Sequence, residues 1–150
     1  MNEEKWSIKG VLCDIAGTLE FREKAIEGAI QVVEQIQNSG LKLALLTNID
    51  SKPPKKVHQN LIDLGFKVDL GQIFTPIRAV KIYLEQFPHK KVHFITTKEV
   101  REEFSDFNIV GENEIPDIVV LSDFSDDLDI RHLNLAFRYA VQGSQLLGTQ

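Results

Sequence analysis

Short runs of apolar residues alternate along this chain with longer segments in which apolar residues recur every three or four positions. The short runs predict β-strands, and the amphipathic segments predict helices. The expected strands lie at 8–13, 41–46, 73–74, 91–96, 109–110 and 118–121, with another beginning at Leu146 and Leu147. The expected helices lie at 25–38, 53–64, 76–87, 96–104 and 127–141. This alternation predicts an α/β protein built from parallel βαβ units with right-handed crossovers.

The same pattern predicts which side chains are buried. The first two strand runs are almost continuously apolar, as expected for a parallel sheet with helices on both faces. Cys13 is therefore expected in the core. The glycines at 40, 65 and 143 are expected to end helices, and Thr96 with Glu99 three residues later fits a capping box. The last helix is expected to turn four apolar residues inward: Ile130, Leu133, Phe137 and Val141.

Composition and charge narrow the class of protein. The chain has 150 residues, of which 43% are hydrophobic and 26% charged, as in ordinary globular domains. A formal net charge of −5 disfavours nucleic acid and anionic membranes as general partners. No apolar run is long enough to span a bilayer, and the first residues do not resemble a secretory signal. The single cysteine, Cys13, rules out an internal disulfide framework and suggests a reducing, cytoplasmic location.

Two polar signatures follow the first two strands. Asp14 comes directly after the first, ahead of a small-residue turn at 16–18, and Thr47 with Asn48 follows the second. Ligands of open parallel sheets bind beyond the carboxyl ends of the strands. Asp14 could act there as a nucleophile or a Mg²⁺ ligand, and Thr47 and the amides of the turn could donate to a phosphoryl oxygen. Each signature alone is more often an ordinary turn, but the two together, separated by one helix, predict a site.

These segments resemble the haloacid dehalogenase (HAD) superfamily. Residues 9–19, KGVLCDIAGTL, are similar to its first motif, and 40–48, ending in Leu46-Thr47-Asn48, to its second. Residues 61–65 and 73–76 resemble the large-cap subclass IIA, and 132–138 resemble a cap helix. The resemblance is greatest to the branch that contains phospholysine phosphohistidine inorganic pyrophosphate phosphatase and haloacid dehalogenase-like hydrolases.

The resemblance implies a fold, a reaction and a set of site residues. It implies a partial Rossmannoid core at 1–78 and most of an α/β cap at 79–150. It implies a Mg²⁺-dependent phosphatase in which Asp14 attacks phosphorus and forms an aspartyl-phosphate, with Thr18 as a further catalytic residue. Asp14 and the carbonyl of Ala16 would hold the metal, and Thr47 and Asn48 would bind the phosphoryl group. The implied substrates are pyrophosphate, phosphoamino acids with P–N bonds, or small phosphate esters.

Three departures from the family pattern shape the expectation for this chain. Ala16 stands where the family usually has a second aspartate, a general acid and base worth roughly 10²–10⁴-fold in rate. The family's lysine and acidic motifs are expected beyond Gln150, so the chain is expected to be truncated and weak or inactive. The first strand is expected at a sheet edge, which favours a homodimer through that edge or through the cap. The alternative reading is a non-catalytic HAD-fold binding or regulatory module.

Other polar residues have simpler interpretations. His89 and His93 are expected on the solvent side of a basic edge rather than in a metal site. The acidic group at 123–129 is expected to favour the start of the last helix. Lys52 is expected to be a solvated loop residue, although it lies near the predicted site.

Overall fold

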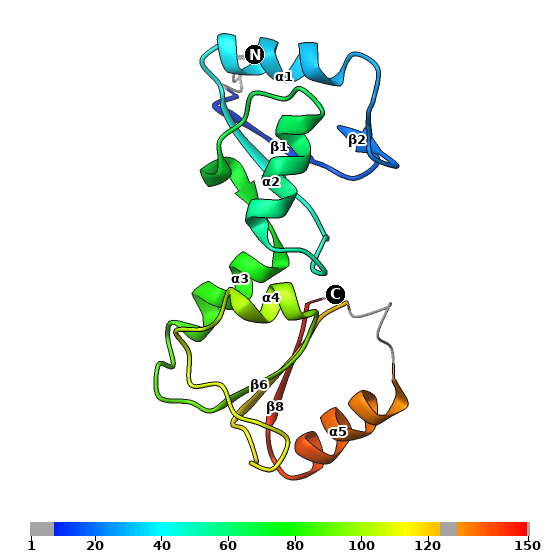
Figure 1. Cartoon of the computed structure of the whole chain (residues 1–150). Coiled ribbons are helices and arrows are strands. Elements are labelled where there is room, and N and C mark those ends of the chain that lie inside the picture. The colour runs from blue at the N-terminus through cyan, green and yellow to red at the C-terminus, as the bar shows by residue number, and fades with distance from the viewer. Residues whose placement is uncertain (1–7, 124–128, 150) are drawn as a thin grey trace, which may run out of the picture. The chain divides into compact units, whose positions relative to one another are not determined.

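The computed structural model describes residues 8–123 and 129–149. The chain divides into two compact units, the first made of 1–47 with 55–74 and the second of 48–54 with 75–150. The boundary between Phe74 and Thr75 lies a few residues before the expected division at 78. Each unit contains its own parallel three-stranded sheet (Figure 1).

The first unit is built around strands in the order β1-β4-β5. Its elements are β1 (Gly10–Asp14), a small hairpin of β2 (Glu20–Phe21) and β3 (Lys24–Ala25), α1 (Ala29–Asn38), β4 (Lys42–Leu46), α2 (Pro54–Asp63), the 3₁₀ turn η1 (Leu70–Gln72) and β5 (Ile73–Phe74). Gly40, with φ 77°, and Gly65, with φ 96°, have the left-handed backbone that ends α1 and α2 as expected. The predicted alternation of strands and helices is therefore confirmed in this unit, but the β2–β3 hairpin was not predicted, and the helix expected from residue 25 begins at Ala29.

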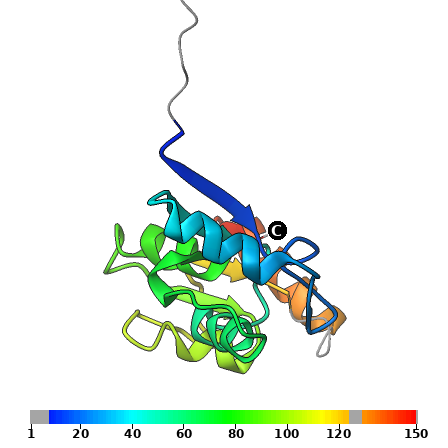
Figure 2. The same ribbon diagram turned by 90° about the horizontal axis from the view of Figure 1, so that it is seen from above.

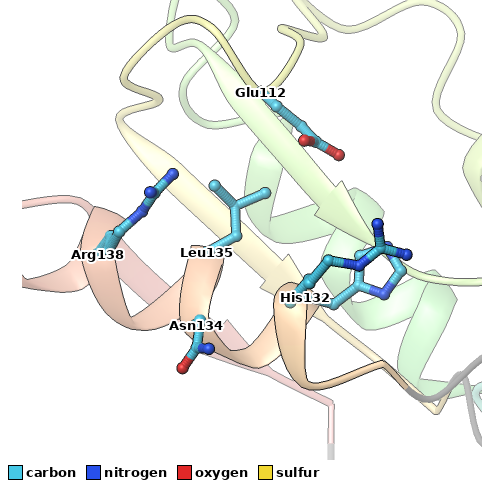
Figure 3. A pocket seen from close by; sticks show the side chains of 6 residues that line it. Glu112, His132, Asn134, Leu135 and Arg138 are labelled. Atoms are coloured by element: carbon cyan, nitrogen blue, oxygen red, sulfur yellow. The ribbon is translucent and has the colours of Figure 1, made fainter.

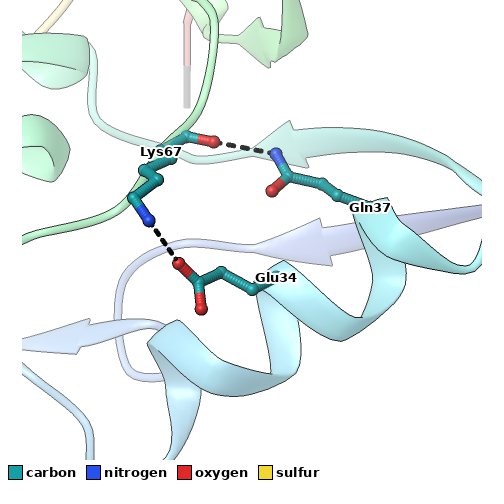
Figure 4. A network of polar contacts seen from close by, with 3 residues as sticks. All are labelled: Glu34, Gln37 and Lys67. Atoms are coloured by element: carbon teal, nitrogen blue, oxygen red, sulfur yellow. Dashed lines mark hydrogen bonds and ion pairs between the residues drawn. The ribbon is translucent and has the colours of Figure 1, made fainter.

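Both helices of this unit lie on the same face of its sheet. The strands follow one another in a single direction, so two right-handed crossovers put α1 and α2 on one side. Direct contacts agree, because Lys67, just after α2, pairs with Glu34 of α1 at 2.9 Å. The amide of Gln37 also donates to the carbonyl of Lys67 at 2.8 Å (Figure 4). In the view of Figure 2, α1 runs alongside β1.

The two faces of this sheet consequently differ in burial. Leu43, Leu45 and Ile73 face the helices and are buried. On the opposite face Leu12 is 74% exposed, and Leu46 and Phe74 are also exposed. The expectation that the first strand is buried is therefore wrong for Leu12, because the helices of its unit cover only the other face and β4 pairs along only one edge. Cys13, on the helix side, is half-buried.

The second unit contains strands in the order β6-β7-β8. Its elements are α3 (Pro76–Leu84), β6 (Val92–Ile95), α4 (Lys98–Glu102), β7 (Ile118–Leu121), α5 (Ile130–Val141) and β8 (Gln145–Gly148). Residues of α3 and α4 pack on one face of this sheet around Phe104, which is fully buried. Residues of α5 pack on the other face. The expected strand at 109–110 is present only as an isolated parallel bridge between Ile109 and Val92.

Two sequence-based assignments in this unit are wrong in detail. The cap of α4 is Thr97, whose hydroxyl accepts from the amide of Val100 at 3.3 Å, and not Thr96. The face of α5 that packs on the sheet carries Leu135, Ala136 and Tyr139. The four residues expected to point inward are exposed instead: Ile130 (67%), Leu133 (40%), Phe137 (68%) and Val141 (70%).

The reason for the second error is that α5 has two apolar stripes. Their centres lie on nearly opposite sides of the helix at about 100° per residue, and periodicity cannot tell which stripe meets the sheet. Asp129 caps this helix, because its carboxylate accepts a hydrogen bond from the amide of Arg131 at 2.8 Å. This agrees with the expectation that the acidic residues at 123–129 favour the start of the last helix. Asp126 and Asp127 of that group lie outside the described residues. Among the described helices, none is long and apolar enough to cross a membrane.

A buried carboxylate ties the segment 48–54 to the second unit. Asp50 is 1% exposed and accepts from the amide of Asp123 at 3.0 Å, just after β7. It also accepts from the hydroxyl of Thr149, just after β8. Thr97 completes the attachment by donating from its hydroxyl to the carbonyl of Ser51 at 3.1 Å. The sequence analysis did not single out Asp50.

Candidate active site

The carboxyl ends of β1 and β4 place Asp14 and Thr47 at the same rim of one sheet. Asp14 is the register partner of Leu46, the last residue of β4. The amide of Ile15 donates to the carbonyl of Leu46 at 3.0 Å, so the pairing continues to the end of both strands. Thr47 follows directly. The parallel alignment inferred from the sequence is therefore present.

A tight turn follows Asp14. The carbonyl of Ile15 accepts from the amides of Thr18, Leu19 and Glu20, and Gly17 has a φ of 82°, which glycine adopts without strain. The amide of Gly17 donates to the carbonyl of Glu20 at 2.7 Å. The expectation that the amides of this turn are left for a phosphoryl group is thus wrong for Gly17 and Thr18, because the turn itself uses them.

Asp14 itself is exposed to solvent. Its Oδ2 accepts from the hydroxyl of Thr18 at 3.4 Å, a long hydrogen bond that orients the carboxylate. Ala16 and Thr18 are also exposed, so the carboxylate opens onto a surface lined by small side chains. The neighbouring Cys13 thiol has a raised pKa, mainly because it is partly buried and secondly because of the negative charge of Asp14. The raised pKa keeps that sulfur neutral.

Thr47 and Asn48 differ in their surroundings. Thr47 is only 5% exposed, and its amide donates to the carbonyl of Phe74 at 3.2 Å. Its backbone is therefore held in place by β5. Asn48 is exposed and belongs to the second unit. The residues brought together within the first unit are thus Asp14, Thr18 and Thr47.

The oxygen atoms at this rim suit a hard cation. Mg²⁺ is commonly held by one or two carboxylates, with water and substrate phosphate completing its shell. The exposed carboxylate of Asp14 and the nearby carbonyl of Ala16 are donors of that type. Within the described ranges no three His, Cys, Asp or Glu side chains form a metal-binding group. The donor set therefore fits a cation shared with a phosphorylated ligand better than one enclosed by protein.

A groove in the second unit was not anticipated from the sequence. Two adjoining pockets of about 440 and 580 Å³ share Glu112, Arg131 and His132. Figure 3 shows the smaller of the two. Arg138 lines the smaller pocket, and it follows Arg131 by seven positions, two helical turns. The seven-residue spacing of these two arginines was the one feature of the sequence that could have pointed to this groove. Asp129 holds Arg131 through a bond of 2.6 Å to its Nε, and this contact lowers the pKa of Asp129.

His93 lies at the base of the larger pocket and is only 6% exposed. Its Nδ1 is 3.0 Å from the carbonyl of Val110, and its ring meets Tyr139 edge-on with centroids 5.3 Å apart. The expectation of a solvent-side His93 is wrong, because α5 covers that face of β6. His89 is exposed as expected, and Lys52, in the loop before α2, is partly exposed.

Comparison with known proteins gives a consistent family. A family model described as haloacid dehalogenase-like hydrolase matches residues 11–110. A phospholysine phosphohistidine inorganic pyrophosphate phosphatase from Danio rerio is 29% identical over 139 residues, covering 90% of this chain and 50% of the relative. Haloacid dehalogenase-like hydrolase domain-containing protein 2 from Mus musculus is 25% identical, covering 94% and 52%. The chain thus spans about half the length of these relatives.

Solved structures show the same fold. NagD from E. coli K-12 superposes with a TM-score of 0.84 at 23% identity, covering 97% of this chain and 58% of that one. A p-nitrophenyl phosphatase from Archaeoglobus fulgidus superposes with a TM-score of 0.85 at 19% identity, covering 95% and 55%. The expected fold class is therefore confirmed.

Proposed function

Because this chain belongs to the haloacid dehalogenase-like hydrolases, we propose that its first unit carries a Mg²⁺-dependent phosphoryl-transfer site centred on Asp14. The observation that carries the proposal is the position of Asp14, an exposed carboxylate at the carboxyl end of a parallel strand, immediately before a tight turn. The proposed substrates are pyrophosphate, P–N phosphoamino acids or small phosphate esters. The phosphatases among the relatives support this choice.

The chemistry proposed for these residues has two steps. A carboxylate oxygen of Asp14 forms a bond to phosphorus while the bond to the leaving group breaks, and the leaving group takes the electron pair. Water then attacks the aspartyl-phosphate, which releases phosphate and restores the carboxylate. Thr18 holds the carboxylate through its hydroxyl, and Thr47 of the same unit contributes to phosphoryl binding. Mg²⁺, held by Asp14 and the Ala16 carbonyl, would offset the negative charge of the phosphoryl group.

Ala16 sets the expected rate. Its methyl group cannot give a proton to the leaving group or take one from water, so the proposed turnover is slow. Substrates whose leaving groups need little protonation, such as p-nitrophenyl phosphate, are therefore favoured over alkyl esters. The same feature supports the second candidate, a non-catalytic module that binds phosphate with Mg²⁺ and does not turn it over.

A paired experiment separates the two candidates. Hydrolysis of p-nitrophenyl phosphate and of pyrophosphate is measured with Mg²⁺ for the natural chain, Asp14→Asn and the control Glu27→Gln, an exposed carboxyl group of the same unit. In parallel, the thermal shift with Mg²⁺ and beryllofluoride, a phosphoryl mimic, is recorded for all three. Turnover lost only in Asp14→Asn supports the enzyme. A thermal shift that requires Asp14, without turnover, supports the binding module. If neither turnover nor a thermal shift is seen, both candidates are refuted.

A further inference from the structure

We infer that the groove of the second unit is a binding site for a small organic oxyanion, a ligand that carries a phosphate or a carboxylate group. By the groove we mean the two adjoining pockets, of about 440 and 580 Å³, that share Glu112, Arg131 and His132. Both volumes fall within the range of small-molecule sites. The lining residues all lie between positions 93 and 138, on β6, α4, α5 and the loop that follows α4. The inference does not rest on the hydrolysis proposed for Asp14.

The loop that forms one wall of the groove is held in place by two buried side chains. The hydroxyl of Tyr139 on α5 donates to the carbonyl of Glu112 at 2.9 Å. Nδ1 of His93 on β6 lies 3.0 Å from the carbonyl of Val110, and the two aromatic residues are only 4% and 6% exposed. Because a carbonyl can only accept, Nδ1 carries the proton, and Nε2 is the ring nitrogen that remains for a ligand. The groove is therefore formed before any ligand binds.

Positive charge is concentrated at the groove, although the chain as a whole is acidic. The cationic side chains that line it are Lys98, Arg101, Arg131 and Arg138, and the carboxylates are Glu112 and Asp129. The whole chain has a formal net charge of −5. Like charges that gather at one place repel one another, and a bound anion relieves this repulsion. The excess of cations therefore favours an anionic ligand.

The two arginines of α5 supply the donors that an oxyanion needs. Asp129 binds Nε of Arg131 at 2.6 Å and its Nη2 at 2.5 Å, which fixes the guanidinium group and leaves other N–H groups of its five for a ligand. Within the described ranges no ion pair engages Arg138. Planar guanidinium groups bind phosphate and carboxylate through paired hydrogen bonds, so these arginines suit either head group.

Glu112 sets a limit on the affinity of the groove. It faces α5 across the smaller pocket (Figure 3), and its exposed carboxylate competes with an incoming anion for the arginines. The head group of the ligand is therefore expected on the α5 side. The larger pocket continues along β6 past Phe94 and Ile95, which gives room for the organic part of the ligand.

Ligand binding tests the inference without any hydrolysis. Isothermal titration calorimetry is performed in EDTA, without Mg²⁺, on the natural chain and on Asp14→Asn. The probes are phenyl phosphate and benzoate, which share a ring and differ in the head group. Saturable binding with a Kd on the order of 0.1–1 mM is expected for at least one probe, and equally in both chains. Tighter phenyl phosphate identifies a phosphate ligand, and tighter benzoate identifies a carboxylate ligand.

Charge variants with opposite effects locate the site. Arg131→Gln and Arg138→Gln are each expected to raise Kd about tenfold, because each removes a charge-assisted hydrogen bond. Glu112→Gln is expected to lower Kd about threefold to tenfold, because it removes the competing carboxylate. The matched control Arg22→Gln removes the same charge from an exposed arginine of the first unit and is expected to leave Kd unchanged. Circular dichroism confirms that each variant is folded.

Backbone amide NMR shifts give the position of the bound probe independently. The shifts are expected to be largest at 110–112 and 131–138. Several outcomes would overturn the inference: no saturable binding of either probe, equal effects of Arg22→Gln and Arg138→Gln, or binding that is lost in Asp14→Asn. The last result would assign the probe to the rim of the first sheet, and it would leave the proposed function standing.

Discussion

The hydroxyl of Thr18 donates to the carboxylate of Asp14 at 3.4 Å, across the turn that follows β1. The bond joins two exposed side chains four residues apart. It forms because the carbonyl of Ile15 accepts hydrogen bonds from three successive backbone amides, which turns the chain back on itself. In the proposed reaction Thr18 would therefore position the nucleophile Asp14 through this bond.

This relationship predicts the effects of two substitutions at position 18. Thr18→Val removes the donor and keeps the shape, and it is expected to lower kcat by about 2–10-fold, the equivalent of one ordinary hydrogen bond. Thr18→Ser keeps the hydroxyl and is expected to retain most of the activity. Steady-state hydrolysis of p-nitrophenyl phosphate measures both. Equal loss in the two variants would contradict a hydrogen-bonding role.

Ala16 offers a gain-of-function test. Its side chain is exposed two residues beyond Asp14, so Ala16→Asp introduces a carboxyl group where the family pattern has its general acid and base. The expected result is a rise in turnover of up to about 10²-fold, with a pH profile that acquires a new acidic limb. Ala16→Asn, equal in size but unable to transfer a proton, should show no rise. A similar gain in both variants would mean that the side chain acts by shape.

The reactivity of the Cys13 thiol should depend measurably on the charge of Asp14. Burial, and secondarily the negative charge of Asp14, raise the pKa of the thiol, so the thiolate forms only above the ordinary pH range for cysteine. The rate of alkylation by iodoacetamide should therefore be low at neutral pH and rise at higher pH than for a free thiol. Asp14→Asn removes the smaller cause and should move this profile to slightly lower pH. A profile that moves upward would exclude the electrostatic contribution.

The orientation of α5 can be tested through stability. Phe104 is fully buried and lies 4.5 Å, centroid to centroid, from Phe94, so Phe104→Ala should reduce the free energy of unfolding by about 3–5 kcal/mol. Phe137 is 68% exposed on the outer stripe of α5, and Phe137→Ala should change it by no more than about 0.5 kcal/mol. Denaturant unfolding, followed in both variants, gives the comparison. A large loss for Phe137→Ala would mean that the outer stripe is buried after all.

The contact between Asp129 and Arg131 has a defined pH dependence. The side-chain bond from Arg131, followed by its backbone bond, lowers the pKa of Asp129 below its ordinary value. A lowered folded-state pKa stabilises the protein above the unfolded-state pKa, and this contribution is lost as the pH falls through the folded-state value. Helix content between neutral and acidic pH should therefore fall less in Asp129→Ala, which lacks this titration, than in the natural chain. Identical acid profiles would contradict the prediction.

The sequence by itself determined the local elements and the identity of the proposed nucleophile. Apolar runs, Thr75 before Pro76, and the glycines at 40, 65 and 143 depend on nearby residues, so they could be interpreted without a structure. The position of Asp14 after a parallel strand followed from the same local pattern. The family resemblance rested on these short segments, and the fold it implied is confirmed.

Only the tertiary structure decided which surfaces are covered. The two apolar stripes of α5 are equivalent as helical patterns, and the sheet selects Leu135 and Tyr139 over Phe137. His93 became buried because α5 packs over β6, and Leu12 stayed exposed because α1 and α2 share one face of the other sheet. Burial depends on which distant segments arrive at a surface and on which side each crossover passes. Neither is encoded within any short stretch of the chain.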